Sequence, residues 1–315
     1  MRNKVVVVGS YNTDLTIKTA RIPNPGETVI GGIFSKGGGG KGANQAVAAV
    51  RAGADVSFIA RVGNDTHGQE GMQRLIEEHV NTQYVIRDPD ASTGVAFIVV
   101  DEHGENSIVV ATGANGRLVP SDIEKSEHAI STANVLLVQL ESPLAAVQSA
   151  IQMARRNGAT VILNPAPAQP LKSELLSNVD IITPNRLEAG MITGMKISDE
   201  ASLRTVAQQI LDYGVKHVIV TLGQAGILLA TRNGMELIPA YKVHAVDSTG
   251  AGDVFSGSLA AFLAEGMTME ESTKMAIASA SISVTRMGAQ FSAPLRAEVE
   301  SFMLSYAPSE IHTPG

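Results

Sequence analysis

Short apolar segments rich in β-branched residues alternate with longer helical patterns along most of this chain, and this alternation limits the possible folds more than any other feature. The strand-like segments fall at residues 4–8, 56–60, 135–139, 160–164, 181–183 and 217–221, and the helical patterns at 43–52, 68–79, 144–157 and 203–213. Each strand-like segment is nearly continuous in apolar residues, which is typical of strands buried on both faces of a parallel sheet. We therefore predict an α/β fold, a three-layer sandwich with a mostly parallel central sheet covered by helices.

Two pairs of strand-like segments have no helical pattern between them and are predicted to form a separate element. Residues 13–17 are expected beside 28–35, and residues 94–100 beside 106–111. A turn at 101–104 closes the second pair, and its Gly104 suits a positive φ. We interpret these segments, about residues 12–36 and 93–111, as a small β-sheet lid on a single α/β domain that covers residues 1–315.

The last third of the chain carries three further patterns. Residues 225–230 and 235–239 are predicted to form an antiparallel pair, and residues 253–264 and 269–284 to form two helices. The tail after Tyr306 is predicted to be frayed.

Composition excludes several classes of protein. With 44% hydrophobic residues in 315, the chain can build a large core, so disorder is excluded as its main state. A net charge of -7 and the absence of a Lys/Arg-rich run argue against nucleic acid as a partner. No apolar run approaches the roughly 18 residues that span a bilayer, so we expect no membrane association. The chain has no cysteine, which excludes disulfides and thiolate chemistry and is compatible with the cytoplasm, where we expect the protein.

The first strand ends in a polar segment that contains Asn12 and Asp14. A dinucleotide-binding fingerprint would need three glycines here, and only Gly9 is present, which argues against a dehydrogenase. The two polar side chains alternate on one side of an extended segment and offer carboxylate and amide groups suited to sugar hydroxyls. An ordinary polar strand end is the alternative interpretation.

A run of four glycines, Gly37 to Gly40, precedes Lys41 and a predicted helix start that includes Asn44. Glycines permit close backbone approach and hinge motion. The segment is not a P-loop, because Ser35 stands where that motif needs its first glycine and Gly42 follows the lysine. The alternative is a flexible loop with a solvated lysine.

A glycine-rich turn at residues 247–253 leads into an apolar helical pattern and carries the clearest chemical signal. The N–H groups of Gly250, Ala251 and Gly252 at a helix start are predicted to form an anion site. Asp253 beside them can accept the proton of an attacking hydroxyl, which together with the anion site is what phosphoryl transfer requires. A carboxylate that merely stabilises a helix start is the alternative.

Two further turns follow predicted strands. Asn185 and Glu188 are spaced to share one face of a helix start, where they could order magnesium near phosphates or simply cap the helix. The glycine turn from Thr221 to Gly226 could approach a nucleotide, although it could equally be an ordinary β turn.

Taken together, these motifs resemble the ribokinase family of carbohydrate kinases, from Val5 to about Phe302. The resemblance rests on residues 39–46, 184–188 and 247–253 in this order, and extends to residues 139–143, 163–168 and 284–290. It implies an ATP-dependent kinase that phosphorylates the 5-hydroxyl of D-ribose to give ribose 5-phosphate and ADP. Asp253 would be the base, and Gly250, Ala251 and Gly252 the anion hole.

The resemblance also implies a set of ligand contacts. The sugar would be held by Asn12, Asp14, Gly40, Lys41, Gly42, Ala43, Asn44, Glu141 and Asp253. ATP would lie along Asn185, Thr221, Leu222, Gly223, Gln224, Ala225 and Gly226, with Gly252 and Asp253, and Glu188 would help to order Mg²⁺. A K⁺ ion would be held at Asp247, Thr249, Ser283, Arg286, Gly288 and Ser292, several of them through backbone carbonyls. The lid strands would form a homodimer contact.

Two other functions remain open from the sequence alone. One is a kinase for 2-deoxyribose or for another small sugar or nucleoside of the same family. The other is a non-catalytic regulator that binds sugar or nucleotide, which the intact segment from Gly250 to Asp253 argues against. Asn12 favours ribose over 2-deoxyribose, since a buried amide placed for the 2-hydroxyl is left unpaired by the analogue that lacks it.

Overall fold

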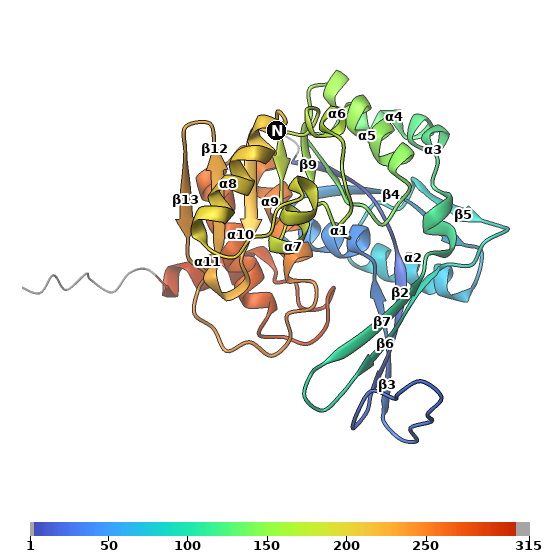
Figure 1. Ribbon diagram of the computed structural model, residues 1–315. Coiled ribbons are helices and arrows are strands. Elements are labelled where there is room, and N and C mark those ends of the chain that lie inside the picture. Colours follow the sequence, from blue (N-terminus) through green and yellow to red (C-terminus); the bar gives the residue numbers. More distant parts are fainter. Residues whose placement is uncertain (1–2, 307–315) are drawn as a thin grey trace, which may run out of the picture.

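The computed structural model describes residues 3–306 and contains one large central sheet (Figure 1). Its strands, in spatial order, are β13 (Gly234–Ile238), β12 (Ile227–Thr231), β11 (His217–Thr221), β10 (Ile181–Ile182), β9 (Thr160–Leu163), β8 (Val135–Val138), β1 (Lys4–Val8), β4 (Asp55–Gly63) and β5 (Val85–Asp88). Neighbouring strands are parallel except where β12 runs against β11 and β13. This confirms the mostly parallel sheet and its late antiparallel pair. The tail after Tyr306, predicted to be frayed, lies outside the described residues.

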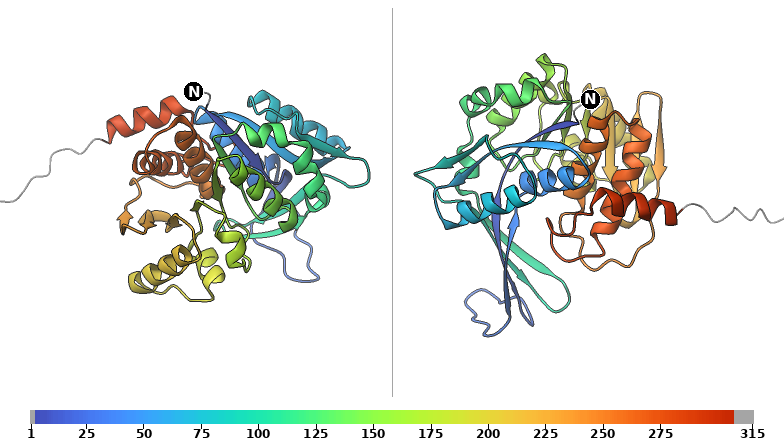
Figure 2. Two further views of the ribbon diagram at one scale, coloured as in Figure 1. Left: turned by 90° about the horizontal axis from the view of Figure 1, so that it is seen from above. Right: turned by 180° about the vertical axis from the view of Figure 1, so that it is seen from behind.

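Helices cover both faces of this sheet, as the alternating pattern predicts. One layer contains α1 (Lys41–Arg51), α2 (Thr66–Glu77), α9 (Ala251–Glu265), α10 (Met269–Ser283) and α11 (Arg296–Ser305). The other contains α3 (Pro120–Lys125), α4 (Glu127–Ser131), α5 (Leu144–Arg156), α6 (Ser173–Leu176), α7 (Arg186–Thr193) and α8 (Glu200–Asp212). The view from above in Figure 2 separates the layers. Successive residues of β1 serve opposite faces: Val5 and Val7 pack in one core, Val6 and Val8 in the other. The three-layer prediction is therefore confirmed.

Four strands form a second, smaller sheet that projects from the body (Figure 1). Its order is β3 (Ile33–Gly39), β2 (Asn12–Lys18), β6 (Gly94–Val100) and β7 (Asn106–Ala111), with β2 and β6 parallel and the other pairs antiparallel. The strands at 94–100 and 106–111 are confirmed at the predicted bounds. Gly104 between them has a φ of 84°, as its turn requires.

The prediction of a strand at 28–35 was wrong in position, because β3 begins at Ile33 and continues through the glycine run. Gly37, Gly38 and Gly39 pair with Asp14, Thr13 and Asn12 of β2, so three of the four glycines are strand residues rather than a flexible loop. Their bare backbones let bulky groups approach: a methyl group on Gly38 would lie 2.6 Å from Oε1 of Gln290.

The parallel strands all end at one edge of the central sheet, which is where open α/β folds bind their ligands. The small sheet begins there, since β2 follows β1 after only three residues. Within residues 3–306, no helix combines the length and apolar character needed to cross a bilayer.

Candidate active site

The predicted sugar-binding residues and the predicted base meet at the carboxyl edge of the sheet. Asn44, in the first turn of α1, donates a hydrogen bond of 2.9 Å from Nδ2 to Oδ2 of Asp253 in the first turn of α9. The N–H of Lys41 donates to Oε2 of Glu141, which follows β8, over 2.9 Å. The hydroxyl of Ser10, after β1, donates to the same carboxylate oxygen. Segments more than 200 residues apart in the sequence therefore build one site.

Two helices begin in this site without a side-chain cap. The residues that precede them, Gly40 and Gly250, have φ values of 86° and 75°, which favour glycine, and as glycines neither has a side chain that could cap its helix. The N–H of Ala251 donates to the carbonyl of Ser248 over 3.2 Å. For the N–H groups of Gly252 and Asp253, residues 3–306 provide no acceptor. Unpaired N–H groups at the positive end of a helix attract an anion.

Lys41 is surrounded by carboxylates rather than solvated. Asp253 first, and then Glu141 and Glu188, raise the pKa of the Lys41 ammonium, against the opposing effect of burial. Burial, with the negative charges of Glu141 and Asp253, raises the pKa of Asp14 to about 7. The site is thus rich in acceptors, which suits a neutral ligand that carries several hydroxyl donors.

Glycine is required where the small sheet meets this cluster. A methyl group on Gly39 would lie 2.2 Å from either carboxylate oxygen of Asp14, and one on Gly40 would lie 2.7 Å from the backbone nitrogen of Asn12. Asp14 therefore lies flat against the backbone of β3. This explains the last two glycines of the run by close approach rather than by hinge motion.

Asn12 is buried and held by Asn115, which belongs to a 3₁₀ turn (Gly113–Arg117). Nδ2 of Asn115 donates to Oδ1 of Asn12 and to the carbonyl of Tyr11, both over 2.8 Å, while Oδ1 of Asn115 accepts from the N–H of Tyr11 over 2.9 Å. These three bonds fix the orientation of both amides. Nδ2 is then the group that Asn12 can offer to a ligand.

Two predicted sugar contacts, Gly42 and Ala43, lie behind the cluster. Ala43 is fully buried, and its N–H donates to the carbonyl of Ser10 over 2.9 Å. A methyl group on Gly42 would lie 2.5 Å from the backbone nitrogen of Ser10. Both residues hold the start of α1 against the end of β1. They therefore fix the positions of Lys41 and Asn44 on α1.

The predicted nucleotide residues form a neighbouring edge of the site. Asn185 and Glu188 make the reciprocal capping contacts of α7: Oδ1 of Asn185 accepts from the N–H of Glu188 over 2.9 Å, and Oε2 of Glu188 accepts from the N–H of Asn185 over 2.8 Å. The capping interpretation is therefore correct, and Oε1 of Glu188 has no hydrogen-bond partner among residues 3–306. Burial raises the pKa of Glu188.

The glycine turn after β11 lies beside this cap. The N–H of Thr221 donates to the carbonyl of Pro184 over 2.8 Å, and Thr221 forms a bridge with Asn185. A 3₁₀ turn (Gly223–Ala225) follows Leu222, and the N–H of Leu222 donates to the carbonyl of Gly226 over 2.8 Å. The three residues of that turn, Gln224 among them, are exposed at the rim. Gly223 and Gly226 have φ values of 62° and 91°.

The two segments of the predicted potassium site come together at Asp247. Its Oδ1 accepts from the N–H of Thr249 over 2.9 Å, and its Oδ2 accepts from the N–H of Gly288 over 2.8 Å. Although burial alone would raise it, these hydrogen bonds hold the pKa of Asp247 below its ordinary value. Arg286 pairs with Glu298 instead, so its charge is directed toward α11.

Ser283 and Ser292 complete this region. Each donates its hydroxyl proton to a nearby carbonyl, that of Ala280 over 2.8 Å and that of Ala289 over 2.7 Å, which leaves the hydroxyl oxygens as acceptors. One carboxylate with hydroxyl and carbonyl oxygens suits a monovalent cation better than a transition metal. In the part of the chain that the structure describes, no three His, Cys, Asp or Glu side chains group as metal ligands.

Sequence reasoning assigned no role to Ser10, Gln45 and Asn115, which contact Glu141, Asp253 and Asn12. The only signal for any of them was the position of Gln45 directly after Asn44. The partners of Ser10 and Asn115 lie more than 100 residues away in the sequence.

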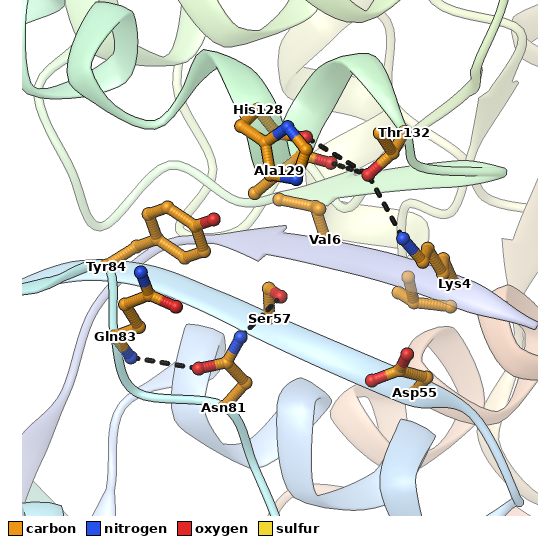
Figure 3. Close-up of a pocket in the computed structure, with 11 residues that line it drawn as sticks. Lys4, Val6, Asp55, Ser57, Asn81, Gln83, Tyr84, His128, Ala129 and Thr132 are labelled. Atoms are coloured by element: carbon orange, nitrogen blue, oxygen red, sulfur yellow. Dashed lines mark hydrogen bonds between the residues drawn. The ribbon is translucent and has the colours of Figure 1, made fainter.

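A pocket of about 220 Å³ lies at the opposite edge of the sheet, where β1 and β4 begin (Figure 3). Lys4, whose Nζ donates to Oγ1 of Thr132 over 3.3 Å, lines this pocket on the side opposite Tyr84. None of the predicted site residues lines it. The chemistry described above therefore belongs to the carboxyl edge.

Known proteins resemble this chain over nearly its full length. Residues 2–296 match the model of the pfkB family carbohydrate kinases. The chain is 42% identical over 303 residues to a ribokinase of Haemophilus influenzae, covering 96% of this chain and 99% of that protein. It is 37% identical over 291 residues to a deoxyribokinase of Salmonella typhi, with 92% and 95% covered. The structure of Arabidopsis thaliana ribokinase complexed with ribose and ATP matches with a TM-score of 0.90 at 31% identity, with 96% and 99% covered.

Proposed function

The chain belongs to the pfkB family of carbohydrate kinases, and from this premise we propose that it transfers the γ-phosphoryl group of ATP to the 5-hydroxyl of D-ribose. The observation that carries the proposal is the contact between Asn44 and Asp253, because it joins the sugar-binding segment to the base. The ribokinase of Haemophilus influenzae, 42% identical to this chain, supports ribose as the acceptor. The products are ribose 5-phosphate and ADP.

Asp253 is the proton acceptor in this proposal. Its carboxylate takes the proton of the 5-hydroxyl while the sugar oxygen forms a bond to the γ-phosphorus and the bond to the β,γ-bridging oxygen breaks. The N–H groups of Gly252 and Asp253, at the positive end of α9, stabilise the negative charge on the transferred group. Base and anion hole lie within one helical turn, so both are positioned by the same element.

The acceptor-rich cluster recognises the sugar. Asp14 and Glu141 accept hydrogen bonds from sugar hydroxyls, and the Lys41 ammonium supplies a donor. The Nδ2 amide of Asn12, fixed by Asn115, donates to the 2-hydroxyl. A sugar without that hydroxyl leaves the buried amide unpaired, so ribose is preferred to 2-deoxyribose.

ATP lies along the turn from Thr221 to Gly226 and beside Asn185. The positive φ values of Gly223 and Gly226 make a concave backbone that can approach a nucleotide closely. The Arabidopsis thaliana ribokinase, whose structure is complexed with ribose and ATP, supports ATP as the phosphoryl donor. Mg²⁺, when bound with ATP, would neutralise phosphate charge. Oε1 of Glu188, which has no hydrogen-bond partner among residues 3–306, is suited to orient a water of that ion.

A monovalent cation, potassium, fits the region around Asp247. When bound, it neutralises that carboxylate and the carbonyl dipoles of the loop from Ser283 to Ser292. The chain's own residues then hold the anion hole: a methyl group on Gly250 would lie 2.8 Å from Cβ of Ala289, so the loop packs directly on the start of α9.

We further propose that the small sheet is a lid over the sugar and that it dimerises with a second copy. Residues paired directly across β3, β2, β6 and β7 share one face. On that face Phe34, Phe97 and Val109 are 63%, 56% and 68% exposed. A contiguous exposed apolar surface is typical of a protein interface. We place the enzyme in the cytoplasm, where its nucleotide substrate is abundant.

The test is ADP release from ATP with Mg²⁺ in potassium buffer, with ribose, 2-deoxyribose, fructose and adenosine offered separately. We expect kcat/KM for ribose to exceed that for the other three acceptors by at least about tenfold, since an unpaired buried polar group costs roughly 1–3 kcal/mol. Preference for 2-deoxyribose would identify the chain as a deoxyribokinase instead. The similarity to the deoxyribokinase of Salmonella typhi makes this the second candidate function. ADP release with none of the four would contradict kinase activity toward these acceptors.

A further inference from the structure

Gln45 occupies an unusual position for a residue next to a predicted active site. Its side chain is fully buried, although it is polar and lies one residue beyond Asn44. Nε2 of Gln45 donates to Oδ1 of Asp253 over 2.9 Å and to Oδ1 of Asn164 over 3.0 Å. Each carboxylate oxygen of Asp253 therefore accepts from a different amide of α1: Oδ2 from Asn44 and Oδ1 from Gln45.

The orientation of Gln45 is determined by its hydrogen bonds to Gln139 and Asn164. Nε2 of Gln139 donates to Oε1 of Gln45 over 2.5 Å, so the NH₂ group of Gln45 is the end that faces the carboxylate. Nδ2 of Asn164 donates to the carbonyl of Thr183 over 2.9 Å, so Asn164 turns its oxygen toward Gln45. Both protons of the Gln45 amide are thus used, and rotating the amide by 180° would break all three of its bonds.

The backbones around this amide are also fixed. A methyl group on Gly257, one turn after Asp253 in α9, would lie 2.4 Å from the carbonyl oxygen of Gln45 and 2.8 Å from Cβ of Ala48. The two helices therefore touch directly below the carboxylate. The distance between Gln45 and Asp253 is set by this close packing as well as by the hydrogen bond.

We infer that Gln45 is a positioning residue for Asp253: with Gln139 and Asn164 it fixes the plane of the carboxylate, so that the oxygen facing the sugar keeps its geometry during proton transfer. This inference rests on the proposed function, because it assumes that Asp253 is the base. A base must lie within hydrogen-bond reach of the proton that it takes. Without Gln45, the carboxylate is held on the sugar side alone, by Asn44, and can turn about its Cβ–Cγ bond.

The decisive variant is Gln45→Glu, which keeps the shape of the side chain and the acceptor for Gln139. Two carboxyl groups in hydrogen-bond contact resist being ionised together, so the new pair retains one proton at moderate pH. With the proton on Glu, the variant still donates to Asp253. When the pH rises and this proton is lost, the donor disappears and the two charges repel.

We expect kcat of Gln45→Glu to fall by about tenfold or more as the pH rises to a value at which wild type is unaffected, while the KM for ribose changes by less than about threefold. The matched control is Gln209→Glu, the same exchange in a partly buried amide of α8 that donates to Tyr213 Oη over 2.6 Å, and its pH profile should parallel that of wild type. A merely structural role of Gln45 would lower kcat equally at every pH. A Gln45→Glu profile parallel to wild type therefore overturns the inference.

A second measurement decides the case in which wild type does not phosphorylate ribose. That result would refute the proposed function, whereas the position of Asp253 can be observed without turnover. In a crystal structure of Gln45→Leu, a carboxylate rotated away from Asn44 supports the inference, and an unchanged carboxylate overturns it. If Gln45→Leu does not fold, the same comparison is made on Gln45→Glu crystals grown at low and high pH.

Discussion

The side-chain amide of Asn44 donates a hydrogen bond of 2.9 Å to Oδ2 of Asp253, across 209 residues of sequence. One of these residues lies in the first turn of α1, where the small sheet joins the body, and the other lies in the first turn of α9, beside the proposed anion hole. The contact therefore aligns the residues proposed to bind the sugar with those proposed to transfer the phosphoryl group. A displacement of either helix start would disturb both binding and chemistry.

Replacing Asp253 by Asn should lower kcat by about 10²- to 10⁴-fold, because an amide cannot accept the hydroxyl proton. Ribose affinity should change much less, since Asn can still hydrogen-bond to a sugar hydroxyl. Steady-state kinetics and ribose titration by calorimetry measure the two effects separately. A variant with near wild-type turnover would remove Asp253 from the role of base.

Potassium should activate the enzyme more than sodium at equal ionic strength. The reason is that backbone turns, rather than flexible side chains, fix the distances between the oxygens around Asp247. Asp247→Ala should abolish this difference, since it removes the one carboxylate in the region. Asp199→Ala is the control: it removes a helix cap of α8 on the other layer and should leave the preference unchanged. Equal rates of wild type in both salts would contradict the cation site.

Asp14 should make ribose binding dependent on pH. Burial, followed by the charges of Glu141 and Asp253, raises its pKa from 3.8 to about 7. Above about pH 7 the ionised carboxylate accepts stronger hydrogen bonds from sugar hydroxyls than the neutral acid does. The KM for ribose should therefore fall as the pH rises from 6 to 8, and the KM of Asp14→Asn should be higher and nearly constant. A wild-type KM that rises over this range would contradict the prediction.

The same carboxyl should affect the stability of the ligand-free protein in the opposite direction. Between its unfolded pKa of 3.8 and its folded pKa of about 7, the folded state binds more of the Asp14 proton than the unfolded state does. The free energy of unfolding should thus fall with rising pH within this window and level off above about 7. Denaturant titrations of wild type and Asp14→Asn check this, because the variant lacks that contribution.

Gly39→Ala should weaken ribose binding by about tenfold or more, since displacing a hydrogen-bonding carboxylate removes roughly 1.5–3 kcal/mol of interaction. Its new methyl group would lie 2.2 Å from the Asp14 carboxylate, which must move away. Gly37→Ala is a matched control two residues earlier in β3, where a methyl group has no neighbour within 4 Å. Equal ribose affinities of the two variants would show that Asp14 does not need this close approach.

Phe97→Lys should shift the protein toward monomers, because it places a charge in the proposed apolar contact between lid sheets. We expect the dimer dissociation constant to rise by about tenfold or more, measured by analytical ultracentrifugation. Leu304→Lys provides the comparison: Leu304 is 80% exposed on α11, outside the small sheet. A wild-type protein that is monomeric at micromolar concentration would refute the proposed dimer.

Periodicity predicted most of the central sheet and the hairpin at 94–111, because these strands carry side chains that mark their burial. It placed β3 wrongly because Gly37, Gly38 and Gly39 carry no side chains and hence no pattern. Gly38 is approached by the side chain of Gln290 and Gly39 by that of Asp14, and both side chains come from other segments of the chain. Contacts of this kind cannot be predicted from the pattern of residues within the strand itself.

Motifs located the two helix starts of the site, since a glycine turn and a carboxylate are adjacent in the sequence at Gly252 and Asp253. They could not assign Gln45, whose partners Gln139, Asn164 and Asp253 come from three distant segments. The spacing of residues in a sequence motif predicts only which side chains are neighbours within one helix, strand or turn. Hydrogen bonds between side chains of different helices and strands can be recognised only when the three-dimensional fold is known.

The distance in sequence between Asn44 and Asp253 also has a consequence for synthesis of the protein on the ribosome. A nascent chain that has emerged only as far as β11 already contains Asn12, Asp14, Lys41 and Glu141, yet it lacks the proposed base and the proposed anion hole. Such a chain, or a product of premature termination, has the residues proposed to bind sugar but lacks those proposed to transfer the phosphoryl group. Under the proposed function, catalytic competence therefore arises late in translation, once α9 has been synthesised and packs against α1.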